Sequence, residues 1–257
     1  MTDAVIQLIP KLDYDIEEAF NKLATNITFC GDDMKILLIT SCREHEGKST
    51  LCFLTWKKLA EMGYRTLMID ADLRRSIFRN RFRMVFQGDE YGLSHYLTRS
   101  GLAVEDAVYR TNIPNGYWIP AGRNVLNSLQ LLSGKKLEVM LSELKKEYDY
   151  VIIDSPPIGA IVDAATIARC CDGAMLVVRH NSTTKQEVLY AKDQIEKSGC
   201  PVLGTILNDV SMNCMSSRYY NQGNYSAYKL GYYSDTAHKR NVKRTHRKYS
   251  KRFGKNG

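Results

Sequence analysis

Five consecutive residues, Glu46-Gly47-Lys48-Ser49-Thr50, could hold the phosphates of a nucleotide. They follow a short apolar segment and open a helical pattern, which is the strand–loop–helix order that a phosphate-binding loop requires. In such a loop, backbone N–H groups at the helix start point at the phosphates, Lys48 adds a positive charge and the Ser49 hydroxyl coordinates Mg²⁺. The first glycine of the pattern G-x-x-x-x-G-K-[ST] is replaced here by Cys42. A chance match is the alternative, but motif and context together favour a nucleotide site.

Three aspartates follow apolar segments and could complete that site. Asp70 and Asp72 end one such segment, 67–72, and Asp154 ends another, 151–154. Because the carboxyl ends of parallel strands meet in one crevice of an α/β sheet, these acids are expected near the phosphate loop. Their oxygens are the ligands that Mg²⁺ prefers. One aspartate alone could simply form a turn after its strand, but three acids beside a Gly-Lys-Ser triplet favour a Mg·ATP site.

The elements that must position these side chains alternate along the chain. Nearly continuous apolar runs predict buried strands at 35–40, 65–69, 117–119, 150–153, 174–179 and 202–207. Helical patterns fall between them, at 15–28, 48–62, 135–147, 163–171 and 184–197. This alternation predicts an α/β fold with a doubly wound, mostly parallel sheet. The stretch 76–116 is less regular, and we expect short helices and loops there.

Composition limits the kind of protein. The 257 residues carry a formal net charge of +8, but the segment 238–257 holds nine Lys and Arg and no acid, so 8 minus 9 leaves −1 for residues 1–237. A near-neutral body argues against a surface built for nucleic acid, which we do not expect as a partner. Seven cysteines without metal-like spacing indicate reduced thiols in the cytoplasm. No apolar run is long enough to cross a membrane.

After residue 207 the pattern stops. We expect a folded domain over 1–210 and a flexible tail over 211–257, because the tail is poor in aliphatic residues and rich in Ser, Asn, Gly and Tyr. Its basic run, 238–257, could be a solvated end, could contact anionic lipids, or could bind phosphotyrosines. Its tyrosine cluster could be adhesive or packed, but the lack of periodicity favours accessible side chains: Tyr219, Tyr220, Tyr225, Tyr228, Tyr232 and Tyr233.

Over residues 18–210 the sequence resembles the bacterial tyrosine kinases (BY-kinases), P-loop enzymes related to the MinD/ParA ATPases. The run 46–50 matches the end of their Walker A motif, and Tyr150 to Pro157 matches Walker B. The run Asp70-Ala71-Asp72-Leu73-Arg74-Arg75 matches a second motif, Walker A′, which separates these kinases from most P-loop ATPases. The segments 92–97 and 120–122 are also similar to the family.

The resemblance implies a role for each residue. Glu46, Gly47, Lys48, Ser49 and Thr50 would bind the phosphates of ATP, with Mg²⁺ held by Ser49, by Asp70 and, through water, by Asp154. Asp70 and Asp72 would serve the metal and the incoming tyrosine, and one of them would be the general base. Asn208 would contact the adenine. The tail tyrosines named above would be the phosphorylation sites.

Partners and place in the cell also follow from the resemblance alone. It implies a cytoplasmic protein-tyrosine kinase that regulates capsular or exopolysaccharide polymerisation and export. A membrane-embedded activator of the polysaccharide co-polymerase type would hold it at the inner face of the membrane. Self-association would allow phosphorylation between subunits, and a cognate tyrosine phosphatase would reverse it.

Several positions depart from the family pattern. Glu44-His45 replaces Pro-Gly, which predicts weaker nucleotide binding because a side chain at 45 disfavours positive φ. Ser76 stands where proline is common. The ring-assembly pattern E-x-x-R-x-x-R begins at Glu18 but lacks both arginines, and the proline-rich segment expected after residue 122 is missing.

Two other functions stay open. A MinD/ParA-type ATPase would switch partners without phosphorylating protein, and its signature lysine corresponds here to Arg43. A pseudokinase scaffold would bind nucleotide weakly, as Glu44 and His45 suggest. The tyrosine cluster and the D-x-D-x-R run favour the kinase.

Overall fold

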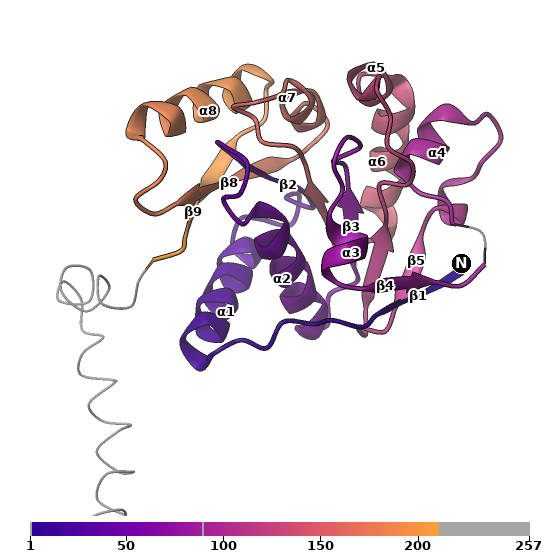
Figure 1. The fold of residues 1–257 in the computed structure, drawn as a ribbon, viewed down its shortest axis with the longest axis horizontal. Coiled ribbons are helices and arrows are strands. Elements are labelled where there is room, and N and C mark those ends of the chain that lie inside the picture. The colour runs from indigo at the N-terminus through magenta and orange to yellow at the C-terminus, as the bar shows by residue number, and fades with distance from the viewer. Residues whose placement is uncertain (1, 89, 211–257) are drawn as a thin grey trace, which may run out of the picture. The chain divides into compact units, whose positions relative to one another are not determined.

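A nine-stranded sheet crosses the part of the chain that the computed structural model describes, residues 2–88 and 90–210 (Figure 1). Its strand order is β4-β1-β5-β6-β3-β7-β2-β8-β9. The strands are β1 Thr2–Ile6, β2 Ile36–Ser41, β3 Thr66–Asp70, β4 Met84–Phe86, β5 Tyr109–Thr111, β6 Gly116–Ile119, β7 Tyr150–Asp154, β8 Gly173–Arg179 and β9 Val202–Asn208.

The six strands predicted from the sequence form one continuous parallel block, from β6 through β3, β7, β2 and β8 to β9. Strands β2, β3 and β7 are buried along their whole length, which explains why they lack alternating polar residues. The predicted doubly wound α/β fold is confirmed.

Helices cover both faces of the sheet (Figure 1). One buried cluster joins α1, α2 and α3 to the sheet, and the other joins α4 to α8. A short 3₁₀ helix, Val104–Asp106, precedes β5. The helices are α1 Tyr14–Thr28, α2 Lys48–Glu61, α3 Phe78–Arg81, α4 Leu93–Thr98, α5 Ser128–Leu132, α6 Lys135–Glu147, α7 Asp163–Ala168 and α8 Lys185–Lys197.

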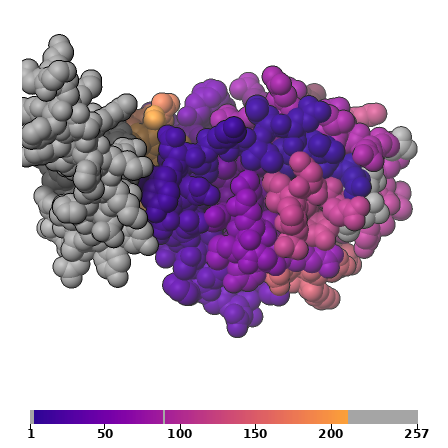
Figure 2. All heavy atoms as spheres, turned by 90° about the horizontal axis from the view of Figure 1, so that it is seen from below, coloured from indigo at the N-terminus to yellow at the C-terminus, as the bar shows by residue number. Residues whose placement is uncertain are grey.

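Three strands at one edge of the sheet, β4, β1 and β5, were not predicted from the sequence. Strand β1 pairs in parallel with β5 and antiparallel with β4, and β5 pairs antiparallel with β6. Strands β4 and β5 have three residues each, too few for a period-two pattern. Figure 2 shows the indigo N-terminal segment lying across one face.

Helix α7 ends at Ala168, earlier than the expected residue 171, because the chain makes tight turns at Cys170 and Cys171.

The register of the central strands determines where the acidic side chains of the site lie. Asp70 of β3 lies directly opposite Asp154 of β7, at the carboxyl ends of two hydrogen-bonded parallel strands. The expected tail, 211–257, with all its tyrosines, lies outside the described residues, so the domain boundary stays a prediction. Within the described part, no helix is long and apolar enough to span a membrane.

Candidate active site

The phosphate loop runs from the end of β2 to the start of α2, with Gly47 immediately before the first helical residue. Gly47 has φ of 87°, a left-handed conformation that glycine adopts without cost. A Cβ atom at this position would lie 2.2 Å from the Asn208 side-chain nitrogen. That nitrogen donates a hydrogen bond to the Glu46 carbonyl over 2.8 Å. Asn208, expected near adenine, therefore lies against the loop; the contact with adenine stays a prediction.

Glu46 shapes the loop from within, a role that its place in the phosphate-loop motif does not predict. Its carboxylate is buried and accepts a hydrogen bond from the Arg43 backbone N–H over 2.8 Å and another from the Thr183 hydroxyl. The loop is thereby closed upon itself and tied to the segment before α8. Cys42 is accommodated at the start of the loop with its side chain buried, and that burial raises the pKa of its thiol to about 12.

Lys48 and Asp154 form a buried ion pair at the base of the loop. Lys48 Nζ lies 2.6 Å from Asp154 Oδ1, and the Ser49 hydroxyl donates to Asp154 Oδ2 over 2.9 Å. Burial alone would lower the pKa of Lys48, but the Asp154 carboxylate outweighs burial and keeps that pKa above its usual value. Lys48 is therefore charged at neutral pH. The structure brings Lys48, Ser49 and Asp154 together, as the sequence predicts.

Asp70 stands beside this pair in an unusual environment. Its side chain is 1% exposed, and burial together with the nearby Asp154 raises its pKa to about 8. The Ser76 hydroxyl donates a hydrogen bond to Asp70 Oδ2 and pulls the pKa back toward its usual value. Asp70 and Ser76 also line a cavity of about 150 Å³. A carboxylate with a pKa near neutrality on a cavity wall can accept a proton.

Asp72 is used differently. Its Oδ1 accepts hydrogen bonds from the backbone N–H groups of Arg74 and Arg75, over 3.3 and 3.0 Å. This is the turn-forming role that aspartate often has after a strand. Asp72 still lies close enough to raise the pKa of Asp70. Asp70, Asp72 and Asp154 lie close together, as the sequence predicts. Each has different hydrogen-bond donors, among them Ser76 for Asp70, backbone N–H groups for Asp72, and Lys48 and Ser49 for Asp154.

A buried anchor that the sequence did not reveal holds the Walker A′ segment. Arg74 Nε lies 3.0 Å from Asp163 Oδ2 and its Nη2 lies 3.3 Å from Oδ1, so the pair is bidentate. The Ser128 hydroxyl donates to the same Asp163 Oδ2 over 2.6 Å. Asp163 and Ser128 are both buried. The available signal was the arginine of the D-x-D-x-R run, but its partner lies 89 residues further along the chain.

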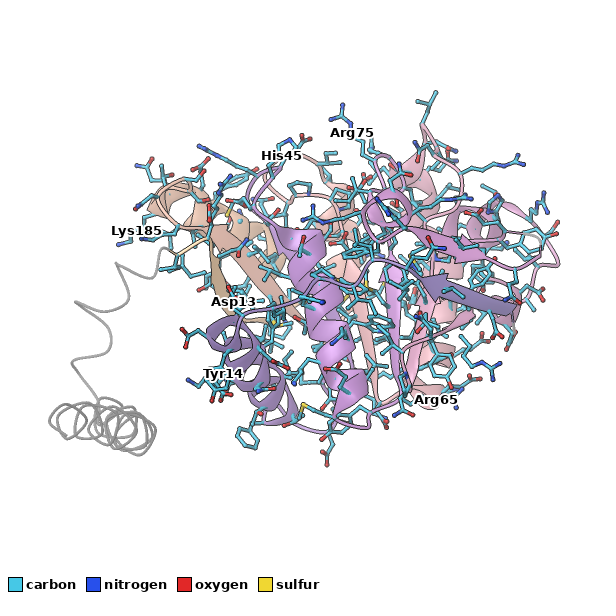
Figure 3. All side chains as sticks on the ribbon, turned by 60° about the horizontal axis from the view of Figure 1, so that its bottom comes forward. Asp13, Tyr14, His45, Arg65, Arg75 and Lys185 are labelled. Atoms are coloured by element: carbon cyan, nitrogen blue, oxygen red, sulfur yellow. The ribbon has the colours of Figure 1, made fainter. Side chains whose placement is uncertain are left out.

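His45 adopts a left-handed backbone with φ of 63°, the conformation for which glycine would be preferred. Figure 3 shows His45 and Arg75 at the same end of the molecule, with Arg65 at the opposite end. Glu44 links the two, since its Oε2 lies 3.7 Å from Arg75 Nη1 and 4.0 Å from His45 Nε2. The expected strain at position 45 is therefore present, and Glu44 already has a cationic neighbour.

Arg43 turns toward its own chain. Its Nε lies 2.5 Å from Glu187 Oε1 at the start of α8, and its Nη1 donates to the Ser182 carbonyl over 3.3 Å. Arg43 is thus part of the connection between the phosphate loop and α8.

The site suits a nucleotide with a magnesium ion. The backbone N–H groups of Glu44, His45 and Gly47 have no acceptor within the described residues, and the buried Thr50 hydroxyl has no partner there. These donors match phosphate oxygens. No group of three or more His, Cys, Asp and Glu side chains in that part of the chain forms a metal site by itself. Mg²⁺ needs only one or two carboxylates when phosphates supply other oxygens, so Ser49 and Asp154 fit it.

Comparison with known proteins agrees with this geometry. Residues 34–188 match the AAA domain family model. Tyrosine-protein kinase CpsD of Streptococcus agalactiae is 43% identical over 210 residues, which cover 81% of this chain and 89% of the relative. The crystal structure of the chimerical protein CapA2B2 superposes with a TM-score of 0.71 at 27% identity, over 80% of this chain and 93% of that one. The septum site-determining protein MinD of Pyrococcus horikoshii, complexed with Mg-ADP, has a TM-score of 0.57 at 25% identity, over 67% of this chain and 69% of that one.

Proposed function

This chain belongs to the bacterial tyrosine-protein kinases, and we propose that it transfers the γ-phosphoryl group of ATP to tyrosine at the site of Lys48, Asp70 and Asp154. The observation that carries this assignment is the position of Asp70. Its carboxylate lies in register with Asp154, beside the charged Lys48, and on the wall of a cavity. A nucleotide site and a candidate proton acceptor therefore adjoin.

The phosphates would be held by the loop N–H groups, Thr50 and Lys48. Ser49 and Asp154 would hold Mg²⁺, which neutralises charge on the phosphate oxygens during transfer. Lys48 would then turn from Asp154 toward the phosphates, and the Asp154 carboxylate would be left to the metal ion. These residues supply positioning and electrostatic stabilisation, which phosphoryl transfer needs more than covalent help.

Asp70 is the better candidate for the general base. Transfer forms a bond between the tyrosine oxygen and the γ-phosphorus, breaks the bond from that phosphorus to ADP, and moves the tyrosine proton to Asp70. Its pKa of about 8 lies near the working pH, which suits proton transfer. Asp72 instead holds the loop that follows Asp70, through the N–H groups of Arg74 and Arg75. The metal-ligand role expected for Asp70 would be secondary to this one.

The substrates and partners rest on the family. We propose that the tyrosines between residues 219 and 233 are phosphorylated between copies of the chain. A membrane-embedded activator would hold the kinase at the inner face of the membrane, where it would regulate capsular or exopolysaccharide export. A tyrosine phosphatase would reset the cycle, and the basic run could add contact with anionic lipid.

The two rival functions have less support. The signature lysine of the MinD-like switch is replaced here by Arg43, which is paired with Glu187 of its own chain. A pseudokinase would lack part of the catalytic set, whereas Lys48, Asp70 and Asp154 are present and adjoining.

The proposal is tested by incubating the purified full chain with Mg·ATP, with and without the cytoplasmic segment of its membrane partner, and measuring phosphotyrosine. We expect a signal that grows with the partner and disappears in Asp70→Asn. Hydrolysis of ATP without any phosphotyrosine would favour the switch, and failure to bind ATP would favour the scaffold.

A further inference from the structure

Two hollows that share part of their lining lie on the Asp70 side of the site. The first is the cavity of about 150 Å³ that has Asp70 on its wall. The second is larger, about 460 Å³, and shares three lining residues with the first: Arg79, Glu90 and Gly122. Because the two hollows have these residues in common, a ligand segment that fills one lies next to the other.

The larger hollow is basic. Its lining includes three arginines, Arg79, Arg99 and Arg123, against the single carboxylate of Glu90. Glu90 is paired with Arg79, whose Nη1 lies 2.5 Å from Glu90 Oε2. Arg99 and Arg123 form no ion pair within the described part of the chain. Among the described residues these two guanidinium groups therefore have no ion-pair partner, which is an arrangement that attracts an anion.

His95 adds a neutral donor to the same wall. Its Nδ1 accepts a hydrogen bond from the Gly92 backbone N–H over 3.1 Å, so the neutral imidazole carries its proton on Nε2. Burial lowers the pKa of His95, and the nearby Arg123 and Arg99 lower it further. The ring is therefore neutral at physiological pH and can donate from Nε2.

An aromatic ring completes the lining. Arg99 lies over the ring of Tyr91, 5.4 Å from its centroid, and the rings of Tyr91 and His95 meet edge to face at 6.0 Å. Guanidinium groups bind phosphate with paired hydrogen bonds and also stack on aromatic faces. The combination suits a phosphate monoester carried on an aromatic ring better than a bare anion.

We propose that this arginine pocket, formed by Arg79, Tyr91, His95, Arg99 and Arg123, binds a phosphotyrosine of the tail while a neighbouring unmodified tyrosine of the same tail enters the cavity at Asp70. The proposal rests on the kinase function above and adds how the enzyme reads its own product. As a consequence, the tyrosines of a tail are phosphorylated one after another, because the first phosphate promotes transfer to the next tyrosine.

The sequence of the tail supports this occupant. Residues 211–257 contain one acid, Asp235, so the unmodified tail offers the pocket almost no negative charge. A phosphotyrosine carries about −1.5 to −2 charges at neutral pH and three acceptor oxygens. Adjacent tyrosines between 219 and 233 are one to five residues apart, so a phosphorylated and an unmodified tyrosine are always close along the chain.

Binding is measured on the full chain, dephosphorylated beforehand and without nucleotide, so that no transfer can occur. Fluorescent peptides spanning residues 217–235 carry either unmodified tyrosines or one phosphotyrosine at position 225, and fluorescence anisotropy gives the affinities. We expect the phosphopeptide to bind about tenfold more tightly. Phenyl phosphate should displace it at lower concentration than inorganic phosphate does, and the reverse order would show a simple phosphate site and overturn the phosphotyrosine assignment.

The variant Arg99→Gln/Arg123→Gln tests the pocket itself. Both arginines are exposed, so the fold should persist, and circular dichroism checks this. The preference for the phosphopeptide should fall to about twofold or less. The control Lys192→Gln/Lys197→Gln removes the same charge from the exposed side of α8 and should keep the preference.

Equal affinity for the two peptides, or a preference that survives the loss of Arg99 and Arg123, overturns the proposal. Because the phosphopeptide is synthetic, its binding does not depend on catalysis. An active kinase without the preference would refute this inference alone, and an inactive chain with the preference would refute the proposed function alone.

Discussion

Lys48 Nζ lies 2.6 Å from Asp154 Oδ1, in a buried ion pair that joins the phosphate loop to the end of β7. Each partner compensates the other for the loss of water. The pair keeps the two charges at the base of the phosphate loop, from which Lys48 would turn to the phosphates of a bound nucleotide. Both charged side chains, Lys48 and Asp154, are therefore already in the site before ATP binds.

Replacing Lys48 with Met should abolish transfer, because it removes the positive charge that would be aimed at the γ-phosphate. The change also leaves Asp154 buried without a cation, and we expect a loss of unfolding free energy of up to about 3–5 kcal/mol. Phosphotyrosine formation and thermal unfolding measure the two effects. The control is Lys57→Met on the same helix, which removes only an ion pair with Glu61 and should change neither quantity by much. Near-normal activity in Lys48→Met would refute the site.

The pH dependence should report Asp70. As a general base Asp70 must be ionised, so kcat/KM for ATP should rise with pH through its pKa of about 8 in the free enzyme. Ser76→Ala removes a hydrogen bond that lowers this pKa, so the acid side of the profile should move to higher pH. Ser133→Ala, an exposed serine bonded only to its own helix, should leave the profile unchanged. If the pH profile of kcat/KM is the same in Ser76→Ala as in the native chain, another group is the base.

Replacing His45 with Gly should tighten ATP binding several-fold. The left-handed φ of 63° costs a non-glycine residue of the order of 1 kcal/mol, and glycine removes this cost and the side chain together. Calorimetric titration with ATP measures the gain. Asn115→Gly relieves a similar φ of 61° elsewhere and should leave ATP affinity unchanged. Equal or weaker binding in His45→Gly would show that the loop has adapted to histidine.

Breaking the anchor between Arg74 and Asp163 should slow catalysis without weakening nucleotide binding. Asp163→Ala leaves the buried Ser128 hydroxyl and the Arg74 guanidinium without an acceptor, at a cost of about 1–3 kcal/mol in unfolding free energy. The segment that follows Asp70 would then move, so kcat should fall while the Kd for ATP stays the same.

The matched control for that anchor is Arg110→Ala. It breaks a bidentate pair with Asp3 that is largely exposed and should cost little. A double-mutant cycle between Arg74 and Asp163 should show a coupling energy in kcat as well as in stability. Coupling in stability alone would reduce the anchor to a purely structural role.

The sequence predicted the parts of this site that depend on local patterns. Lys48 and Ser49 follow from one motif, and Asp70 and Asp154 follow from apolar strands that end in acids. It could not separate Asp70 from Asp72, because burial of one and turn formation by the other depend on tertiary contacts. The anchor at Asp163 and the arginine pocket were missed because their residues come from segments far apart in the sequence. The short strands β4 and β5 have too few residues for any periodic signal.

The most direct test of the account is mass spectrometry of the full chain after incubation with Mg·ATP and the activating segment, with Asp70→Asn and Asp72→Asn alongside. The account predicts phosphate on Tyr219, Tyr220, Tyr225, Tyr228, Tyr232 or Tyr233 in the native chain. It predicts a loss of about 10²–10⁴-fold in rate for Asp70→Asn and a smaller loss for Asp72→Asn. Phosphate confined to body tyrosines such as Tyr64, or a native rate in Asp70→Asn, would contradict it.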